Sequence, residues 1–392
     1  VGAVIVSYGL SFGQSLIAML GIFSYLLIGY FGINGARTGR PTMALSQFSF
    51  GTVGNVFPSI VSWLNLVGWE TIVLVLASYI VETILHQLFG LRMGAGTTLL
   101  ALALVTFAAF SVALLGYATL VKIQTFISYV FGALTAIVFV LLVPHIHWAQ
   151  ILAVKSGSWL KGVLPATSIV IAAGGLSWVN GAADYTRYLP PQESGKKIVG
   201  ATMLGAFIPG AALLVFGILL AFSMPTLATA SNPIVLLKDA LPGWMAIPYL
   251  LTAVAGMVAG DIMDVYSSGL SLLAARIKLP RSRTVFFDAI LSISGSLYVL
   301  LVAKNFVNTF ESLLTILAGF LTPWAAVFLV DTMRHLRYGY PQTVPAVRWS
   351  AWIAWIVGIA ASLLFTSTSI FSGPFATGIF NGSSLGFLLG FL

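Results

Sequence analysis

The segment PGWMAIPYLLTAVAGMVAGDIMDVYSSGL, residues 242–270, is long and apolar enough to cross a bilayer as a helix. It nevertheless contains two aspartates, Asp261 and Asp264. A charged side chain at the centre of a bilayer costs about 2.5–3.5 kcal/mol on insertion scales, so an intramembrane carboxylate is a functional candidate by default. Glycines flank the pair and could loosen the helix there. This span therefore predicts a pathway for a solute or an ion.

The composition of the whole chain indicates a membrane protein. Hydrophobic residues make up 59% and charged residues 7% of the 392 residues, and the mean hydropathy is +1.03. Soluble domains contain about 25% charged residues, so this chain could not cover a water-facing surface. There is no cysteine, which excludes disulfides and thiolate metal sites.

Apolar stretches follow one another along the sequence, and most reach the ~17–25 residues that a spanning helix needs. They are continuously apolar and do not alternate, which predicts helices and excludes a β-barrel. The stretch 351–366 is short and fits a span least well. The stretches are 13–36, 54–85, 98–116, 122–144, 162–183, 198–222, 244–272, 285–303, 309–331, 351–366 and 376–392.

The basic residues predict the orientation. If residue 1 enters the outer leaflet, the connections of one side contain 13 of the 18 Lys and Arg residues and those of the other side contain 5. The rich side should be cytoplasmic, so we expect the loops 37–53, 187–197, 274–284 and 334–349 there. The net charge of +8 then reflects topology and attraction to lipid, and gives no indication of nucleic-acid binding.

The predicted outer connections contain no soluble domain. The longest, 145–161, includes His145 and His147. Such a pair could bind a metal, but exposed loop histidines are usually bystanders, so we predict no metal site. The segment 223–243 is amphipathic and predicts a short helix on the outer face.

The stretch 54–85 contains polar residues well inside the predicted span. Asn65 and Trp69 are four residues apart and share a helix face. A mid-membrane tryptophan that faces a cavity is a stacking platform for a planar ligand, although Trp69 could equally fill a contact between helices. Glu70 lies about 100° round the helix from Trp69, where it could pair with another span or bind a proton.

The stretch 162–188 is a poor continuous helix. Gly174 and Gly175 are adjacent and are followed by Ser177 and Trp178. A glycine pair can mark an unwound point whose backbone groups line a site. It can also allow two helices to pack closely, which is common in membranes.

Two local ion pairs are expected near the ends of spans. Glu82 and His86 are four residues apart at the predicted outer end of one helix. Asp184 and Arg187 are three apart at a predicted cytoplasmic end, where a structural or gating pair is the natural interpretation.

Asp261, Asp264 and Ser268 lie on one stripe of their helix. They could bind a cation, relay a proton or hydrogen-bond a polar substrate, or form a structural pair with partners elsewhere. Two neighbouring carboxylates in a low dielectric cannot both ionise cheaply, which favours protonation chemistry.

Four segments, correctly ordered and spread over most of the chain, resemble the signatures of one transporter family. They are GARTGRPTMALSQFSFGTVGNVFPSIVSWLNLVGWE (35–70), SWVNGAADYTRYLP (177–190), DVYSSGLSLLAA (264–275) and FLTPWAAVFLVD (320–331). The first resembles the loop and third helix of the nucleobase:cation symporter family. The others resemble that family's sixth-helix ending, especially in purine–cytosine permeases, its eighth-helix ending and its tenth helix.

The resemblance implies an all-α polytopic fold, the leucine-transporter-type five-plus-five inverted repeat with two additional C-terminal helices. The chain would be one transmembrane transporter domain, 1–392, with a first repeat at about 1–144, a second at about 162–331 and the extra helices at about 350–392. Residues 1–8 would correspond to the outer half of the first helix, which would be incomplete in this chain.

The resemblance implies which residues of this chain would bind substrate, and only some of them have the side chains typical of the family. Trp69 falls on the family's stacking tryptophan, but Val73 stands where a hydrogen-bonding Gln or Asn is frequent. A second stacking aromatic of hydantoin-type relatives would fall at Gly175, whereas this chain offers Trp178.

This chain matches the family less well at the residues that form the sodium site in sodium-coupled members. Their two adjacent hydroxyl residues would fall at Ala259 and Gly260, which have no hydroxyl. Asp261 replaces an asparagine that contacts substrate in relatives. These departures favour H+ over Na+ as the coupling ion, with Na+ as the alternative.

We therefore predict a symporter of the cytoplasmic membrane that imports a planar nitrogen heterocycle, such as cytosine or a purine, without a cofactor. Alternatives are a passive facilitator, a symporter for allantoin, hydantoin or a vitamin ring, and an intramembrane enzyme, for which no catalytic motif is present. The predicted substrate-binding residues are Asn65, Trp69, Gly175, Ser177, Trp178, Asp261 and Asp264. The predicted coupling residues are Asp261, Asp264 and Glu70.

Overall fold

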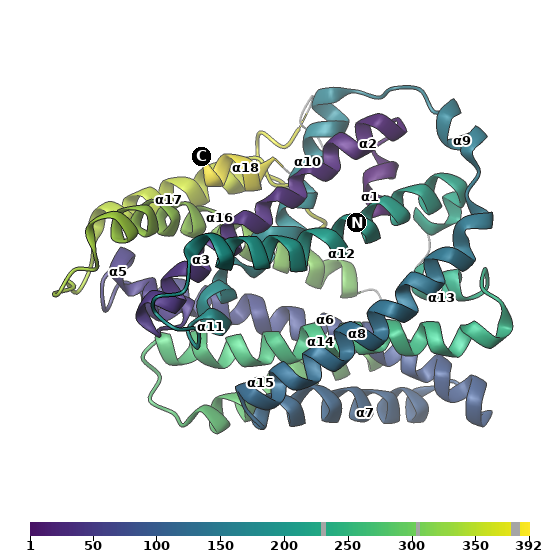
Figure 1. The fold of residues 1–392 in the computed structure, drawn as a ribbon, viewed down its shortest axis with the longest axis horizontal. Coiled ribbons are helices and arrows are strands. Elements are labelled where there is room, and N and C mark those ends of the chain that lie inside the picture. Colours follow the sequence, from purple (N-terminus) through teal and green to yellow (C-terminus); the bar gives the residue numbers. More distant parts are fainter. Residues whose placement is uncertain (229–232, 303–305, 378–384) are drawn as a thin grey trace.

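The computed structural model is helical almost throughout, and it describes residues 1–228, 233–302, 306–377 and 385–392 (Figure 1). Within these ranges, nine helical segments are long and apolar enough to cross a membrane, and Trp349–Leu364 is a shorter apolar helix. The nine segments are Phe12–Thr38, Val56–Phe89, Ala95–Leu114, Tyr117–His145, Trp159–Thr186, Gly195–Ser223, Gly243–Ala274, Ser282–Leu301 and Ser312–Tyr338.

The first half of the chain, up to the predicted outer connection 145–161, forms the elements α1 to α9. They are α1 (Gly2–Ser7), α2 (Phe12–Ala18), η1 (Met19–Ser24), α3 (Tyr25–Thr38), α4 (Thr42–Leu45), α5 (Gln47–Phe50), α6 (Val56–Phe89), α7 (Ala95–Leu114), α8 (Tyr117–Leu142), η2 (Val143–His145) and α9 (Trp148–Ala153).

The second half contains one broken span and several long helices. Its elements are η3 (Trp159–Val163), α10 (Leu164–Ile171), η4 (Ala172–Leu176), η5 (Val179–Gly181), α11 (Ala182–Thr186), α12 (Gly195–Ser223), η6 (Pro225–Ala228), α13 (Pro233–Lys238), α14 (Gly243–Ala274), α15 (Arg281–Leu301), α16 (Phe306–Tyr338), α17 (Trp349–Leu364) and α18 (Gly386–Phe391).

Two long helices end where the sequence supplies a glycine. Gly39 follows α3 with φ 68° and Gly90 follows α6 with φ 66°, and both are left-handed C-caps. A residue with a side chain would be strained in that conformation, so glycine sets the length of these helices.

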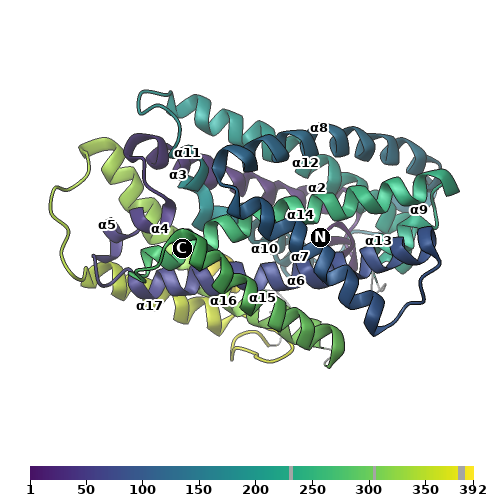
Figure 2. The same cartoon turned by 90° about the horizontal axis from the view of Figure 1, so that it is seen from below.

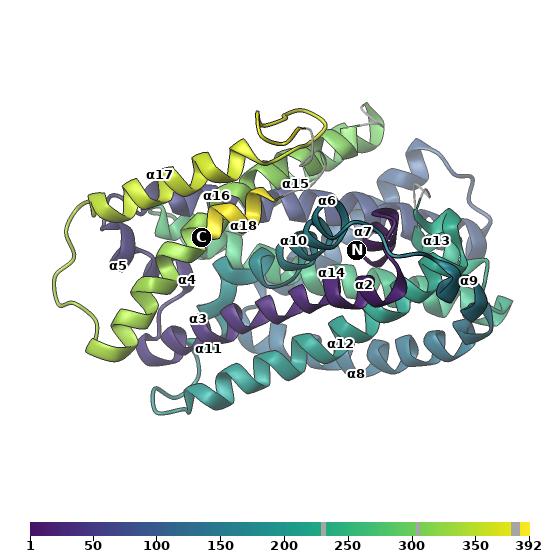
Figure 3. The same cartoon turned by 90° about the horizontal axis from the view of Figure 1, so that it is seen from above.

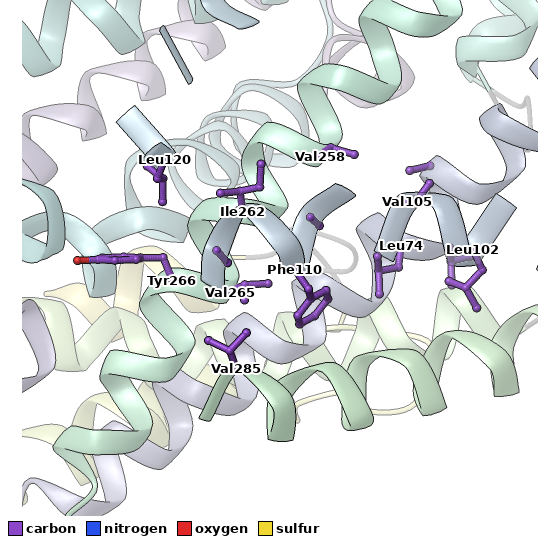
Figure 4. Packing of buried hydrophobic residues seen from close by; sticks show 14 of the residues in the cluster. Leu74, Leu102, Val105, Phe110, Leu120, Val258, Ile262, Val265, Tyr266 and Val285 are labelled. Carbon is purple, nitrogen blue, oxygen red and sulfur yellow. The ribbon is translucent and has the colours of Figure 1, made fainter. Parts of the chain in front are cut away.

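The helices α6, α7, α14 and α15 pack against one another, and α6 and α14 run alongside each other over much of their length (Figure 2). Their apolar side chains form one buried cluster, in which Leu74, Leu102 and Val105 meet at one end (Figure 4). Ile262 and Val265 of α14 lie further along the same cluster. Of this four-helix group, α6 lines the candidate site.

A second cluster joins α3, α16 and α17, and Phe31, Trp324 and Trp355 are fully buried in it. Seen from above, α16 and α17 run along one side of the molecule and α12 and α8 along the other (Figure 3). The broken span α10–η4 lies between the two sides, where it faces α16 and η1.

Polar contacts fix the connection between α16 and α17. Arg348 Nη1 donates to Asp331 Oδ2 at 2.7 Å and to the carbonyl of Phe48 at 2.6 Å. The hydroxyl of Tyr340 donates to Asn34 Oδ1 on α3. Burial raises the pKa of Tyr340, so this hydroxyl remains a donor at neutral pH.

Three predictions about single segments have different outcomes. The segment 223–243 does contain a short helix, α13, although residues 229–232 lie outside the described part. The predicted span 376–392 also includes undescribed residues, 378–384, and its described end is the six-residue helix α18, which is too short to cross a bilayer. The loosening expected around the glycines of α14 is wrong, because α14 is one continuous helix of 32 residues.

Candidate functional site

A cavity of about 600 Å³ lies between α6, the broken span α10–η4 and α16. Asn65 and Trp69 line it from α6, and Ser177 lines it from just beyond η4. Thr315 and Thr322 add hydroxyl groups from α16, while most of the remaining wall is apolar. An apolar cavity with a few converging polar groups is typical of a small-molecule site.

Trp69 is 37% exposed although it lies in the middle of a spanning helix. Asn65 is one turn away on the same face of α6, as its spacing predicted. Ser177 faces both from the broken span, and its hydroxyl donates to the carbonyl of Gly174 at 2.8 Å. The structure therefore brings together three of the predicted substrate-binding residues.

The two glycines of the broken span differ in their structural roles, since one interrupts the helix and the other allows close packing. Gly174 has non-helical angles, φ −92° and ψ −113°, and interrupts the helix. Gly175 packs closely against η1, since its amide donates to Ser24 Oγ at 2.8 Å and a Cβ there would lie 2.1 Å from the carbonyl of Ser24. Gly175 thus faces Ser24, and Trp178 is half-buried beside Ser177.

The predicted carboxylates lie away from this cavity. Glu70 follows Trp69 but points to the other side of α6, where its Oε2 accepts a hydrogen bond from Ser292 of α15 at 2.8 Å. Asp261 and Asp264 are buried on α14 within the four-helix group. The sequence had assigned both aspartates to substrate binding, but the structure separates them from the cavity that contains Trp69.

A fourth buried carboxylate, Asp288 of α15, was missed by the sequence analysis. Its Oδ1 accepts a hydrogen bond from Trp63 Nε1 at 2.7 Å, and its Oδ2 accepts one from Ser268 Oγ at 3.0 Å. The signal was present, because Asp288 interrupts the apolar stretch 285–303 just as Asp261 interrupts its own span.

The four carboxylates form one electrostatic group, which we call the acidic cluster: Glu70, Asp261, Asp264 and Asp288. Asp261 interacts with Glu70 and Asp264, and Glu70 interacts with Asp288. Both oxygens of Asp261 and Oε1 of Glu70 are buried without a hydrogen-bond partner. A buried charge without donors is costly, so these oxygens point to a proton or another cation as their partner.

Asp184 and Arg187, the predicted ion pair, interact electrostatically, but the described contacts give each of them other direct hydrogen-bond partners. Asp184 Oδ1 accepts hydrogen bonds from the amide and the hydroxyl of Thr42, at 2.8 and 3.0 Å. Arg187 Nη2 donates instead to the hydroxyls of Tyr188 and Tyr266, at 2.7 and 2.8 Å. The reason is local: α11 ends at Thr186, so Arg187 turns toward α14 while Asp184 faces the first turn of α4.

The predicted pair of Glu82 with His86 is wrong. Glu82 Oε1 accepts from the amide of Gly94 at 2.9 Å and from the hydroxyl of Thr98 at 3.0 Å. His86 Nδ1 lies 2.8 Å from the carbonyl of Leu91. Free backbone groups at the start of α7 are therefore the partner of Glu82.

A second cavity, of about 380 Å³, opens between α8, α11 and α14 and is lined by Gln124, Tyr185 and Met263, among others. Gln124 Nε2 donates to the carbonyl of Ala259 at 2.6 Å. Asp264, which interacts with Tyr185, is 9% exposed, whereas Asp261, Glu70 and Asp288 are fully buried. Asp264 is thus the least buried member of the acidic cluster, and it follows Met263 of the cavity lining in the sequence.

Comparison with known families gives one match over almost the entire chain. The profile of the family described as "Permease for cytosine/purines, uracil, thiamine, allantoin" matches residues 1–390. A putative purine-cytosine permease of Bacillus subtilis, YxlA, is 24% identical over 413 residues, which cover 99% of this chain and 85% of that protein. The cytosine permease of Escherichia coli K12 is 25% identical over 379 residues, covering 90% and 79%.

Solved structures show the same fold. Mhp1, a nucleobase-cation-symport-1 family transporter solved in a closed conformation with bromovinylhydantoin bound, superimposes with a TM-score of 0.66 at 17% identity, covering 99% of this chain and 88% of that one. A Na+-coupled sialic acid symporter in an outward-open state gives a TM-score of 0.63 at 12% identity, covering 100% and 87%. The predicted fold class, the leucine-transporter-type inverted repeat, is confirmed.

Proposed function

Because the chain belongs to the family of permeases for cytosine/purines, uracil, thiamine and allantoin, we propose that this secondary transporter imports a planar nitrogen heterocycle, cytosine or a purine, together with a proton. It is a multi-pass membrane protein, and we place it in the cytoplasmic membrane. Transport would proceed by alternating access around a site near the middle of the bilayer.

The exposed face of Trp69 inside the cavity is the observation that carries the proposal. An aromatic ring in a mostly apolar cavity stacks on any planar π system, and such stacking is worth about 1–3 kcal/mol per base in nucleic-acid binders. The Asn65 amide and the Ser177 hydroxyl would hydrogen-bond the polar edge of the ring. Trp178, which follows Ser177, is our candidate for its opposite face.

Proton coupling is assigned to the buried carboxylates Asp261, Asp264 and Glu70. Asp261 lies outside the cavity that contains Trp69, which argues against the alternative that it accepts hydrogen bonds from the substrate. Its two unpartnered oxygens instead fit a group that gains and loses a proton. Ala259 and Gly260, at the positions of the expected sodium-binding hydroxyls, support the same choice.

A counterflow experiment tests the substrate class. The purified protein in proteoliposomes loaded with unlabelled compound should take up labelled cytosine, adenine or hypoxanthine by exchange, while labelled allantoin and hydantoin test the alternative rings. Exchange of a heterocycle that Trp69→Ala reduces would support the proposal. Exchange of no heterocycle in the panel by a folded protein would reject it.

A further inference from the structure

The acidic cluster lies on the side of α6 away from Trp69, and Asp288 is a member that neither the sequence analysis nor the proposed function uses. We infer that, of the three carboxylates proposed above for proton coupling, Glu70 is the one that takes up and releases the proton, and that Asp288 pairs with it as the fixed negative charge. The inference rests on the proposed function, since it names the site through which that symport would be coupled.

Asp288 is built to remain ionised. Its two oxygens each accept one hydrogen bond, from Trp63 Nε1 and from Ser268 Oγ, and its side chain is fully buried. Hydrogen bonds donated to a carboxylate stabilise the charged form, and in a low dielectric they are stronger than in water. Phe287 stacks on the Trp63 ring at 5.7 Å and holds the indole in position for this bond.

Glu70 has only half of that support. Ser292 donates to its Oε2, while its Oε1 is buried and has no hydrogen-bond partner. The Ser268 hydroxyl, which donates to Asp288, also lies near enough to favour the charged form of Glu70. Asp288 acts on it with a negative charge. A proton on the bare oxygen would remove the uncompensated charge of Glu70 and leave that of Asp288 in place, which makes Glu70 the member of the pair that exchanges its proton.

The surroundings supply no positive charge to either group. Among the described residues, no basic side chain forms an ion pair with a member of the acidic cluster, and α4 and α7 contain no ionisable residue at all. Among the residues whose side chains the structure describes, the ionisable groups on the other elements packed against α6, α14 and α15 are Tyr117, Lys122 and Tyr129 of α8, Asp184 and Tyr185 of α11, Lys238 of α13, and Asp331, Arg334, His335, Arg337 and Tyr338 of α16.

The helices of the cluster add further ionisable groups, and the basic ones lie near helix ends. Besides the four carboxylates, those with described side chains are Tyr79, Glu82 and His86 of α6, Tyr249 and Tyr266 of α14, and Arg283 and Tyr298 of α15. Lys122, His86 and Arg283 are exposed, so they do not neutralise the cluster. The cluster therefore attracts a cation from outside the protein.

The arrangement suits protons better than a chelated metal ion. Within the described ranges, no three acidic or histidine side chains converge closely enough to hold a metal. The carboxylates are spread over three helices, and each meets a hydroxyl, an indole or another carboxyl at most. A proton needs only one oxygen, so this spread is compatible with it.

The position of Glu70 also explains how binding of the heterocycle and binding of the proton could be coupled. Trp69 and Glu70 are neighbours on α6, about 100° apart around the helix. A ring stacked on Trp69 and a proton on Glu70 would therefore bias the position of the same helix, and two ligands that bias one element are coupled reciprocally.

Two isosteric variants test the pair, Asp288→Asn and Glu70→Gln. In proteoliposomes we expect each to lower accumulation of labelled cytosine driven by an inwardly directed pH gradient about tenfold more than it lowers counterflow exchange, because exchange does not require net proton movement. Glu82→Gln is the matched control, since Glu82 is a buried carboxylate of the same helix with its own partners at Gly94 and Thr98. Its ratio of accumulation to exchange should match that of the unmodified protein.

A third variant, Trp63→Phe, keeps the ring stack on Phe287 but removes the hydrogen bond to Asp288. Without this hydrogen bond the ionised form of Asp288 is less stable. When uptake is plotted against pH, the fall in uptake on the acidic side should therefore move about one unit to higher pH. The control Trp355→Phe removes an indole hydrogen bond elsewhere, to the carbonyl of Phe320, and should leave the profile in place. This readout holds even if Asp288→Asn fails to fold.

The outcomes separate the inference from the proposed function. If the unmodified protein exchanges no heterocycle, the proposed function fails. If it accumulates cytosine with the pH gradient but Asp288→Asn and Glu70→Gln do so equally well, or Trp63→Phe leaves the profile unshifted, the inference is overturned and the function stands. If a sodium gradient drives the accumulation and a pH gradient does not, the proton pair is rejected.

Discussion

Trp69 and Glu70 are adjacent in the sequence and lie in opposite environments. Helical periodicity was sufficient to place Asn65 and Trp69 on one face and Glu70 on another, and the structure agrees. The same periodicity could not show which neighbouring helix each face meets. Asp261 was assigned to the substrate site because it replaces an asparagine that contacts substrate in relatives. Asp288 was overlooked although it interrupts an apolar stretch, and its partners Trp63 and Ser268, which come from two other spans, could not be identified from the sequence.

Replacing Trp69 tests the stacking surface. Trp69→Ala should raise the Kd for the heterocycle by about 10- to 100-fold, because a stacked base is worth about 1–3 kcal/mol, and Trp69→Phe should lose less because it keeps a ring. Ligand binding measured by scintillation proximity on the purified protein checks this. Trp349→Ala, at a site 71% exposed on α17, serves as the control. Normal binding by folded Trp69→Ala would mean that this tryptophan only packs against its neighbours.

At the scale of elements, the sequence predicted the break in 162–188 and wrongly predicted loosening around the glycines of α14. The two cases differ in their neighbours. Gly175 lies against the backbone of η1, which leaves no room for a side chain, whereas Gly256 and Gly260 have open space where a Cβ would be. The glycines alone do not show whether another segment packs against them, because η1, which packs against Gly175, is distant in the sequence.

Gly175→Ala tests the close approach of the broken span to η1. The added Cβ would meet the carbonyl carbon and oxygen of Ser24 at 2.1 Å, and backbone atoms cannot move away cheaply. We expect a loss of about 1–3 kcal/mol in stability, seen as a lower Tm in detergent.

Gly205→Ala of α12, with nothing within 4 Å of the added carbon, is the control and should change stability by no more than about 0.5 kcal/mol. A Tm for Gly175→Ala equal to that of this control would show that η1 and the broken span do not pack as described.

At the scale of the molecule, composition and run length were enough to predict a helical membrane protein. The predicted span 376–392 lies partly outside the described residues, which give only the short helix α18 at its end. Orientation in the membrane rests on the basic residues alone, 13 of which fall on one side.

The orientation can be checked with single cysteines, since the chain contains none of its own. Cysteine at Ser194, before α12, or at Ser282, in the first turn of α15, should resist an impermeant thiol reagent in intact cells and react after the membrane is permeabilised. Labelling of either position from outside would reverse the assignment of the cytoplasmic face.

The central claim is that uptake of a heterocycle is driven by protons. Its most direct test is the accumulation of labelled cytosine by purified protein in proteoliposomes under an imposed pH gradient, with the membrane potential clamped and sodium absent. The account predicts concentrative uptake that a protonophore abolishes and that added sodium does not increase. Accumulation that follows a sodium gradient and ignores the pH gradient would contradict it.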